Sequence, residues 1–378
     1  MTHKIQIQSS GHEFTANENE TVLAAALRQG VTLAYSCRNG DCGTCKGRII
    51  AGQVDYGKYE AKAMSNEERG AGAALFCQAV PLSDLVIEAR EISAAEGIPI
   101  RIMPCRVMKL DRLAPDVMQL SLKLAEGQRL QFLAGQYIDI LLSGNKRRSF
   151  SLATAPHADE LLQLHVRHVP GGLFSEQVFT TMKERDLLRF QGPLGTFFLR
   201  EDSDVQGSTN AGRSQHPASR GISTSMYVTG DRKSGAAADR PVILVAGGTG
   251  FAPIKSILDH AFAQGTTRPL HLYWGVRAQR DLYLHDLPQA WAREHAHFRY
   301  TPVLSEPLSE DHWSGRTGWV HEAVIADHPD LSRHEVYASG PPPMIEALKK
   351  AVIAHGLPND RLYYDSFEHA HASASGAG

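Results

Sequence analysis

The sequence predicts a multidomain protein of the α+β and α/β classes, with three folded segments in a chain of 378 residues. Residues 1–92 contain short strand patterns around one helix, and residues 100–202 alternate apolar and polar side chains with a period of two. From 240 to 368, short apolar runs alternate with helical patterns, which is typical of a parallel sheet covered by helices. Residues 203–239 are rich in Ser, Gly, Ala and Thr and are expected to form a disordered insertion, with a regulatory or partner-binding loop as the alternative. A flexible tail is expected over 369–378.

The elements of the N-terminal segment follow from its apolar pattern and its turn residues. A helix is expected over 21–30, because Thr21 is a suitable N-cap and Gly30 a suitable stop. The expected strands of this segment are 4–8, 14–17, 47–51 and 85–89.

The two following segments differ in how their strands are patterned. Residues 117–122 and 162–166 alternate with period two, as in antiparallel strands with one buried face. The later apolar runs are nearly continuous, as in parallel strands buried on both faces; they are 241–246, 270–274 and 335–338.

Composition excludes several classes of function. The chain is 42% hydrophobic and 21% charged, with a formal net charge of −2, which argues against nucleic acid or an anionic membrane as the main partner. No apolar run approaches the length needed to span a bilayer, and no targeting segment is apparent. A cytoplasmic location is therefore expected.

Four cysteines carry the most specific chemical signal. The spacing is C-x4-C-x2-C with a distant fourth, and the predicted metal ligands are Cys37, Cys42, Cys45 and Cys77. This is the plant-type spacing for a [2Fe–2S] cluster, which carries one electron at a time. A structural zinc site would show two separated C-x-x-C-like pairs, and a disulfide framework would be denser in cysteine. Glycines at 40, 43 and 47 are expected to let the loop turn, and Cys105 is expected to pack as a small hydrophobe.

Two groups of motifs in the later segments suit binding of two different nucleotides. Arg148, Ser149, Phe150 and Ser151 match R-x-[YF]-S, where an arginine can pair with a pyrophosphate and an aromatic ring can pack on a flavin. The segment 246–253 places glycines between a strand and a helix, where a backbone can approach a pyrophosphate closely. Further turns end later strands at 275–277 and 339–344.

Taken in order, these motifs resemble those of iron–sulfur flavoprotein reductases with a plant-type ferredoxin domain ahead of a ferredoxin–NADP reductase-like module. The resemblance covers residues 1 to about 369 apart from the insertion, through R-x-[YF]-S, G-x-x-S, G-G-T-G-x-A-P and C-G-P-x-x-M patterns. It implies a β-grasp ferredoxin domain, a six-stranded antiparallel FAD-binding β-barrel and a parallel α/β nicotinamide-binding domain. The implied cofactors are a [2Fe–2S] cluster, FAD and NADH.

The resemblance also implies roles for individual residues. Those implied to bind FAD are Arg148, Ser149, Phe150, Ser151, His165, Val166, Arg167, Gly172, Ser175 and Phe367. Those implied to bind the nicotinamide nucleotide are Gly248, Thr249, Gly250, Arg277, Gly340, Pro341 and Met344. The residues expected at the reacting groups are Ser151, Thr249, Ser339 and Phe367. Two positions depart from the family pattern, since Ser339 stands at the family's cysteine and Phe150 at its commoner tyrosine.

The expected activity is electron transfer from NADH through FAD and the cluster to a protein acceptor. NADH is favoured over NADPH because Arg277 is a single arginine followed by Asp281, without a serine-plus-basic cluster for a 2′-phosphate. For the acceptor, the chain resembles CDP-6-deoxy-3,4-glucoseen reductase, whose acceptor is a dehydrase. The alternative is the reductase of an aromatic-ring or di-iron oxygenase. A redox sensor is a third reading, but it gives the flavin and nicotinamide motifs no role.

Overall fold

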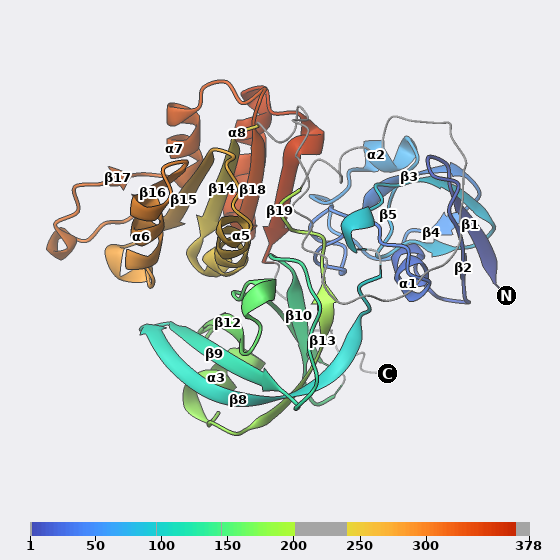
Figure 1. The fold of residues 1–378 in the computed structure, drawn as a ribbon. Helices are drawn as coiled ribbons and strands as arrows, with labels where there is room; N and C mark the ends of the chain where they lie inside the picture. The colour runs from blue at the N-terminus through green and yellow to red at the C-terminus, as the bar shows by residue number, and fades with distance from the viewer. Residues whose placement is uncertain (1, 96, 145, 201–239, 368–378) are drawn as a thin grey trace.

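The computed structural model of the protein describes residues 2–95, 97–144, 146–200 and 240–367. In Figure 1 the N-terminal segment (blue), the β-rich segment (cyan to green) and the C-terminal segment (yellow to red) form three lobes. Each lobe has a buried apolar core of its own. The predicted insertion at 203–239 and the predicted tail at 369–378 lie outside the described residues.

The N-terminal lobe is built on a five-stranded sheet in the order β2-β1-β7-β3-β5. Strands β1 and β7 are parallel, and the other neighbours are antiparallel. The bounds are β1 His3–Ile7, β2 Glu13–Ala16, β3 Lys46–Ala51, β5 Ala73–Leu75 and β7 Leu85–Glu88, with β4 Val54–Asp55 and β6 Val80–Pro81 in a separate two-stranded sheet. The four expected strands are thus confirmed to within one residue at each end.

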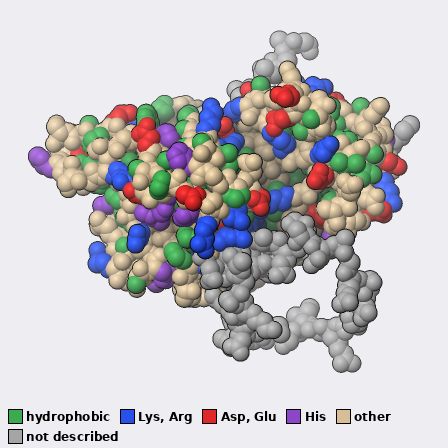
Figure 2. Space-filling view, turned by 90° about the horizontal axis from the view of Figure 1, so that it is seen from above, with side chains coloured by type: hydrophobic (Ala, Val, Ile, Leu, Met, Phe, Trp, Pro, Cys, Tyr) green, Lys and Arg blue, Asp and Glu red, His purple; other side chains and the backbone are tan. Residues whose placement is uncertain are grey.

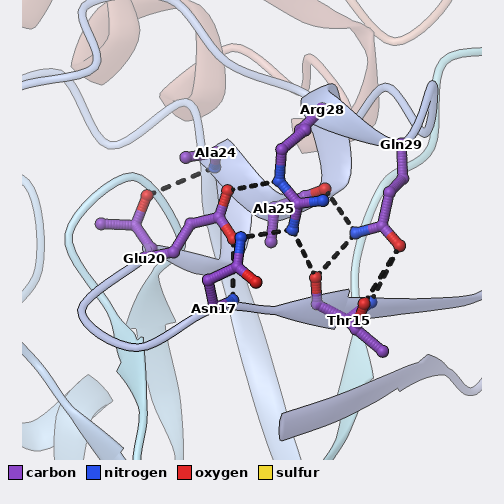
Figure 3. A network of polar contacts seen from close by, with 8 residues as sticks. Thr15, Asn17, Glu20, Ala24, Ala25, Arg28 and Gln29 are labelled. Atoms are coloured by element: carbon purple, nitrogen blue, oxygen red, sulfur yellow. Dashed lines mark hydrogen bonds and ion pairs between the residues drawn. The ribbon is translucent and has the colours of Figure 1, made fainter. Parts of the chain in front are cut away.

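Helix α1, Val22–Arg28, begins and ends as the sequence predicts. The Thr21 side chain accepts a hydrogen bond from the Ala24 N–H at 3.3 Å, and Gly30 follows the helix with a φ of +81°. Figure 3 shows how the last turn is fixed to the neighbouring strand β2: Arg28 donates to the Glu20 carboxylate and to the Thr15 carbonyl, each at 2.8 Å. The second helix of this lobe is α2, Asn66–Gly70.

The β-rich lobe is a six-stranded antiparallel sheet in the order β11-β10-β13-β8-β9-β12. The bounds are β8 Arg101–Ala114, β9 Val117–Leu124, β10 Tyr137–Leu141, β11 Arg147–Ser151, β12 Leu162–Arg167 and β13 Leu187–Leu194. An isolated bridge between Leu152 and Leu164 joins the two edges of the sheet at one end. Helix α3, Leu173–Thr180, packs its buried Phe174 and Val178 into the core of this lobe.

The C-terminal lobe is a six-stranded parallel sheet in the order β17-β16-β15-β14-β18-β19. The bounds are β14 Val242–Gly247, β15 Leu270–Val276, β16 Phe298–Leu304, β17 Arg316–Thr317, β18 Glu335–Gly340 and β19 Leu362–Ser366. The three apolar runs expected as parallel strands are the central ones, β15, β14 and β18.

Helices cover both faces of this parallel sheet, as its two-sided burial requires. Helices α5, Phe251–Ala263, and α6, Asp286–Glu294, contribute to the apolar core on one face. Helices α7, Val320–Asp327, and α8, Pro342–Ala354, contribute to the core on the other.

The burial of three single side chains shows how the cores are filled. Cys105 is buried, and burial raises the pKa of its thiol to about 12, so its packing role is confirmed. Trp274 is fully buried in the core of the C-terminal lobe. Trp319, at the start of α7, is 60% exposed and lies outside the core. The residue lies just after β17, and this loop turns it toward solvent.

The described surface carries charges of both signs. On the face seen in Figure 2, Lys and Arg side chains (blue) and Asp and Glu side chains (red) both occur across the surface. Among the described residues, no helix is both long and apolar enough to cross a lipid bilayer.

Candidate functional site

The four predicted cluster ligands come together in the N-terminal lobe as two pairs of thiols. Hydrogen bonding with Cys42 lowers the pKa of Cys37, and hydrogen bonding with Cys45 lowers the pKa of Cys77. All four are free thiols, three buried and Cys37 half-buried. The first pair, Cys37 and Cys42, is five positions apart in the sequence. The second pair, Cys45 and Cys77, is thirty-two positions apart, so the fold brings the distant fourth cysteine to the loop.

This pairing suits two metal ions better than one. Two pairs of thiols match the chemistry of a cluster in which each of two irons takes two protein thiolates. The donor set thus fits a [2Fe–2S] group.

The loop backbone is shaped to surround sulfur. Backbone hydrogen bonding from Asn39, Asp41 and Cys42 adds to the lowering of the Cys37 pKa, as expected of a loop that tunes a bound cluster. Gly40 has a φ of +86°, and an added Cβ would lie 2.7 Å from the Lys58 carbonyl oxygen, so this turn requires glycine.

Gly47 differs from the turn glycines of the loop. It lies in β3, where an added Cβ would lie 2.1 Å from a ring carbon of Phe76. Its expected role in turning the loop is therefore wrong, because the position requires glycine for close packing of the strand on an aromatic ring.

The predicted flavin motif is the edge strand β11 of the β-rich lobe. Alternation along the strand separates its side chains into two sets. Phe150 packs on Phe174 of α3 with ring centroids 5.1 Å apart. Ser149 and Ser151 instead donate to carboxylates of Asp139 and Asp365, at 2.6 and 3.2 Å.

The predicted FAD residues of β12 have different environments. His165 is buried and its Nδ1 lies 3.0 Å from the Tyr283 hydroxyl, while burial lowers its pKa to about 3. The imidazole is therefore neutral at physiological pH. The Val166 side chain is fully buried in the apolar core, so only its backbone is available to a cofactor. Arg167 pairs with Asp116 at 2.8 Å.

The loop before α3 contains the other predicted FAD residues. Gly172 is the N-cap of α3, and an added Cβ would lie 2.5 Å from the Ser175 hydroxyl. Ser175 is buried, and its hydroxyl lies 3.2 Å from both the backbone N–H and the carbonyl of Val169. The Ser175 hydroxyl thus holds the loop in place. Gly172 has no side chain, so the N-terminus of α3 stays accessible to a phosphate group.

The glycine-rich loop joins β14 to α5 at the carboxyl edge of the parallel sheet. An added Cβ on Gly250 would lie 2.0 Å from the Ser339 carbonyl oxygen, and one on Gly248 would lie 2.8 Å from the Arg167 guanidinium. The loop is therefore packed closely against both β18 and the β-rich lobe. Thr249 is buried between them.

Other predicted nucleotide residues lie at the end of β18 or just after β15 and β19. The Ser339 hydroxyl is fully buried and has no hydrogen-bond partner among the described residues. Such an orphaned polar atom beside the glycine loop fits a site that a ligand completes. Phe367 follows β19 and donates its N–H to the Gly340 carbonyl at 3.0 Å. Arg277 is mostly exposed, with its guanidinium 3.8 Å from Asp281.

Met344 and Pro341 complete the turn between β18 and α8. An added Cβ on Gly247 would lie 2.5 Å from the Met344 sulfur and 2.8 Å from Pro341 Cδ. These two residues therefore pack on the end of β14 rather than project freely toward a ligand.

Sequence reasoning missed the two buried aspartates on which the three lobes meet. Asp139 is fully buried in β10 and forms an ion pair with Arg38 of the cysteine loop. Asp365, in β19, accepts a hydrogen bond from the Ser36 hydroxyl at 2.7 Å. The signal for Asp139 was an acid within Tyr137–Leu141, a strand otherwise apolar apart from Tyr137.

Comparisons with known proteins support this arrangement of three lobes. A "2Fe-2S iron-sulfur cluster binding domain" model matches residues 5–82, an "Oxidoreductase FAD-binding domain" model 104–199 and an "Oxidoreductase NAD-binding domain" model 244–350. The CDP-6-deoxy-L-threo-D-glycero-4-hexulose-3-dehydrase reductase of Yersinia pestis is 35% identical, with 97% of this chain and 99% of the relative covered. The chain belongs to the iron–sulfur flavoprotein reductases.

Other similar proteins are named as reductases of different enzyme systems. The reductase component of propane 2-monooxygenase from Gordonia sp. (strain TY-5) is 30% identical, with 97% of each chain covered. The crystal structure of the Amycolatopsis cytochrome P450 reductase GcoB matches with a TM-score of 0.74 and 32% identity, over 97% of this chain and 98% of that one. The protein is accordingly an electron-transfer oxidoreductase with a ferredoxin domain, an FAD-binding domain and a nicotinamide-binding domain.

Proposed function

We propose that the protein transfers electrons from NADH through FAD and a [2Fe–2S] cluster to a separate dehydrase, as a reductase of the CDP-6-deoxy-3,4-glucoseen reductase type. The observation that supports electron transfer from FAD to the cluster is a carboxylate shared by the two sites. Asp365 accepts hydrogen bonds from Ser36, next to the cysteine loop, and from Ser151 of the flavin motif. The two predicted redox sites therefore adjoin within one chain.

In this proposal each cofactor is held by residues with a distinct task. When bound, FAD and the cluster would convert the two-electron donor NADH into a source of single electrons. The proposed cluster ligands are Cys37, Cys42, Cys45 and Cys77; the proposed FAD residues are Arg148, Ser149, Phe150, Ser151, His165, Val166, Arg167, Gly172, Ser175 and Phe367.

On the nicotinamide side, the proposed residues are Gly248, Thr249, Gly250, Arg277, Ser339, Gly340, Pro341 and Met344. The glycine loop would present backbone N–H groups to the pyrophosphate at the start of α5. The buried Ser339 hydroxyl would orient the nicotinamide by a hydrogen bond, since nothing in the described chain already uses it.

NADH rather than NADPH is the proposed donor. Arg277 lies 3.8 Å from Asp281, whose carboxylate also accepts from the Ala278 N–H at 3.2 Å. A carboxylate fixed at the end of β15 favours a ribose hydroxyl and repels a 2′-phosphate.

The proposed acceptor rests on similarity alone. The relative named as a dehydrase reductase is 35% identical to this chain, whereas the propane monooxygenase reductase component is 30% identical. The reductase component of an oxygenase is the second candidate, favoured by the structural likeness to a cytochrome P450 reductase. We also propose a cytoplasmic location, because the four thiols require a reducing compartment.

Rapid mixing with NADH or NADPH tests the proposal. Loss of the flavin absorbance and then of the cluster absorbance is expected with NADH, and at least about tenfold more slowly with NADPH. Purified dehydrase and purified oxygenase components would then be compared as acceptors at equal concentration. Bound flavin and iron that neither nucleotide reduces would refute the reductase proposal and favour a redox sensor.

A further inference from the structure

The first cluster-ligand position, Cys37, lies between two residues that are held by other lobes. Ser36 donates its hydroxyl to Asp365 of the nicotinamide-binding lobe at 2.7 Å. Arg38 forms an ion pair with Asp139 of the β-rich lobe. The chain is therefore fixed on both sides of Cys37, by carboxylates from two different lobes.

The same two carboxylates also hold the flavin motif. Asp139 accepts from the Ser149 hydroxyl at 2.6 Å, and Asp365 accepts from the Ser151 hydroxyl at 3.2 Å. Strand pairing explains the first contact, because Asp139 and Ser149 are direct partners across β10 and β11. Each aspartate thus touches the cysteine loop with one oxygen and the flavin motif with the other.

Burial makes both contacts sensitive to the loss of a partner. Asp139 is fully buried and Asp365 is 7% exposed. Asp139 is compensated by the Arg38 guanidinium, whose side chain is only 15% exposed, and by the more exposed Arg147 at 3.6 Å. Burial raises the pKa of Asp365, while its hydrogen bonds with Ser36 and Ser151 lower it. A buried carboxylate that loses a donor is costly, so these bonds favour one docked arrangement of the lobes.

We propose that Asp139 and Asp365 are positioning residues that fix Cys37 against the flavin motif for the transfer of electrons into the cluster. The inference rests on the proposed function, because it concerns the step between the two redox groups. Further hydrogen bonds hold the same loop across this interface. Tyr137 donates to the Ser36 carbonyl at 2.7 Å, and Tyr364 donates to the Cys42 carbonyl at 3.0 Å.

The test uses the full chain loaded with FAD and iron, mixed rapidly with NADH. Flavin bleaching and cluster bleaching are recorded as separate steps. Ser36→Ala removes one hydroxyl and no charge, and we expect it to slow cluster bleaching about tenfold, equivalent to about 1.4 kcal/mol of lost docking. Flavin bleaching in this variant is expected to stay within about twofold of the wild type.

A second variant and a matched control separate positioning from general damage. Asp139→Asn removes the charge that pairs with Arg38 and is expected to slow cluster bleaching by at least the same factor. Asp159→Asn makes the same substitution in the same lobe, at a carboxylate 2.6 Å from the exposed Arg129, and is expected to change neither step. The EPR spectrum of the reduced cluster is expected to be unchanged in Ser36→Ala.

Amide hydrogen exchange gives a readout that does not depend on turnover. Tyr35 and Thr196 connect the lobes by hydrogen bonds that use both backbone amides: the Tyr35 N–H donates to the Thr196 side-chain hydroxyl at 3.0 Å, and the Thr196 N–H donates to the Tyr35 carbonyl at 3.1 Å. Faster exchange at these two amides is expected in Ser36→Ala and Asp139→Asn.

Unchanged cluster bleaching and unchanged exchange in Ser36→Ala would overturn the inference, even if Asp139→Asn failed to retain its cofactors. Failure of NADH to bleach the cluster in the wild type would instead refute the proposed function. The two failures are therefore distinguishable.

Discussion

Replacing Ser339 by alanine is expected to stabilise the nucleotide-free protein. The Ser339 hydroxyl is fully buried and has no partner among the described residues. A buried polar group without a hydrogen bond costs about 1–3 kcal/mol. Alanine removes that group without adding bulk, so we expect the free energy of unfolding to rise by about 1 kcal/mol.

Calorimetry of the chain without nucleotide measures this effect. For a domain of roughly 150–250 residues, 1 kcal/mol corresponds to an increase in Tm of about 2–4 °C. Saturating NAD⁺ is expected to reduce the difference, because the wild-type hydroxyl would then gain a partner. FAD reduction by NADH should be slower in Ser339→Ala, whereas Ser339→Cys, which restores the family residue, should keep or raise that rate.

Ser256 provides a matched control, because its replacement by alanine is expected to change the free energy of unfolding in the opposite direction. Its hydroxyl is also fully buried, but it donates to the Thr154 carbonyl at 2.6 Å. Ser256→Ala is therefore expected to lower the free energy of unfolding by about 1–2 kcal/mol. Equal destabilisation by the two alanine variants would refute the reasoning, because it would mean that the Ser339 hydroxyl is satisfied in the folded protein. A collapse of FAD reduction in Ser339→Cys would refute the assignment of this position to the nicotinamide site.

Three further predictions concern acid stability, the glycine loop and the cluster. Burial, followed by repulsion from His328, lowers the pKa of His271 to about 4, against about 6.5 in an unfolded chain. The stability that depends on a neutral His271 is present above pH 6.5 and lost as the pH falls toward 4, at about 2 kcal/mol between pH 7 and pH 5. Denaturant unfolding at the two pH values should show a smaller loss in His271→Gln, and an equal loss would contradict the assignment. Gly250→Ala should slow NADH-dependent flavin bleaching more than tenfold, since its Cβ would overlap the Ser339 carbonyl, whereas Gly70→Ala, with open space around it, should not. Cys42→Ser should abolish cluster absorbance and electron transfer to one-electron protein acceptors but leave NADH-to-ferricyanide activity through FAD; loss of both activities with FAD still bound would contradict the ordered route.

The sequence predicted elements wherever the side-chain pattern reflects one local period. Continuous apolar runs identified β14, β15 and β18. Helices cover both faces of these parallel strands, so neither face requires polar side chains. The cysteine spacing likewise predicted a gathered set of thiols, since three of the four lie within one short loop.

Contacts between lobes could not be predicted in this way. Alternation in β10 puts Tyr137 and Asp139 on one face and Ile138 on the other. Nothing local indicates what covers the polar face, because Arg38 lies 101 positions away along the chain. The prediction for Gly47 was wrong for a related reason. Its neighbour Phe76 directly follows β5, and the sequence of the cysteine loop does not indicate that contact.

The interface around the cysteine loop makes electron transfer within the chain different in kind from electron transfer to a separate acceptor. Its ion pair and hydrogen bonds are buried and lie within one chain, so an electron passed across it needs no collision between proteins. Dissolved salt screens buried charge pairs weakly, and dilution cannot separate tethered lobes. The internal transfer should therefore be first order and nearly insensitive to ionic strength. Delivery to a separate acceptor, in contrast, must depend on the concentration of that acceptor, so the cell can regulate the second transfer through protein abundance without changing the first.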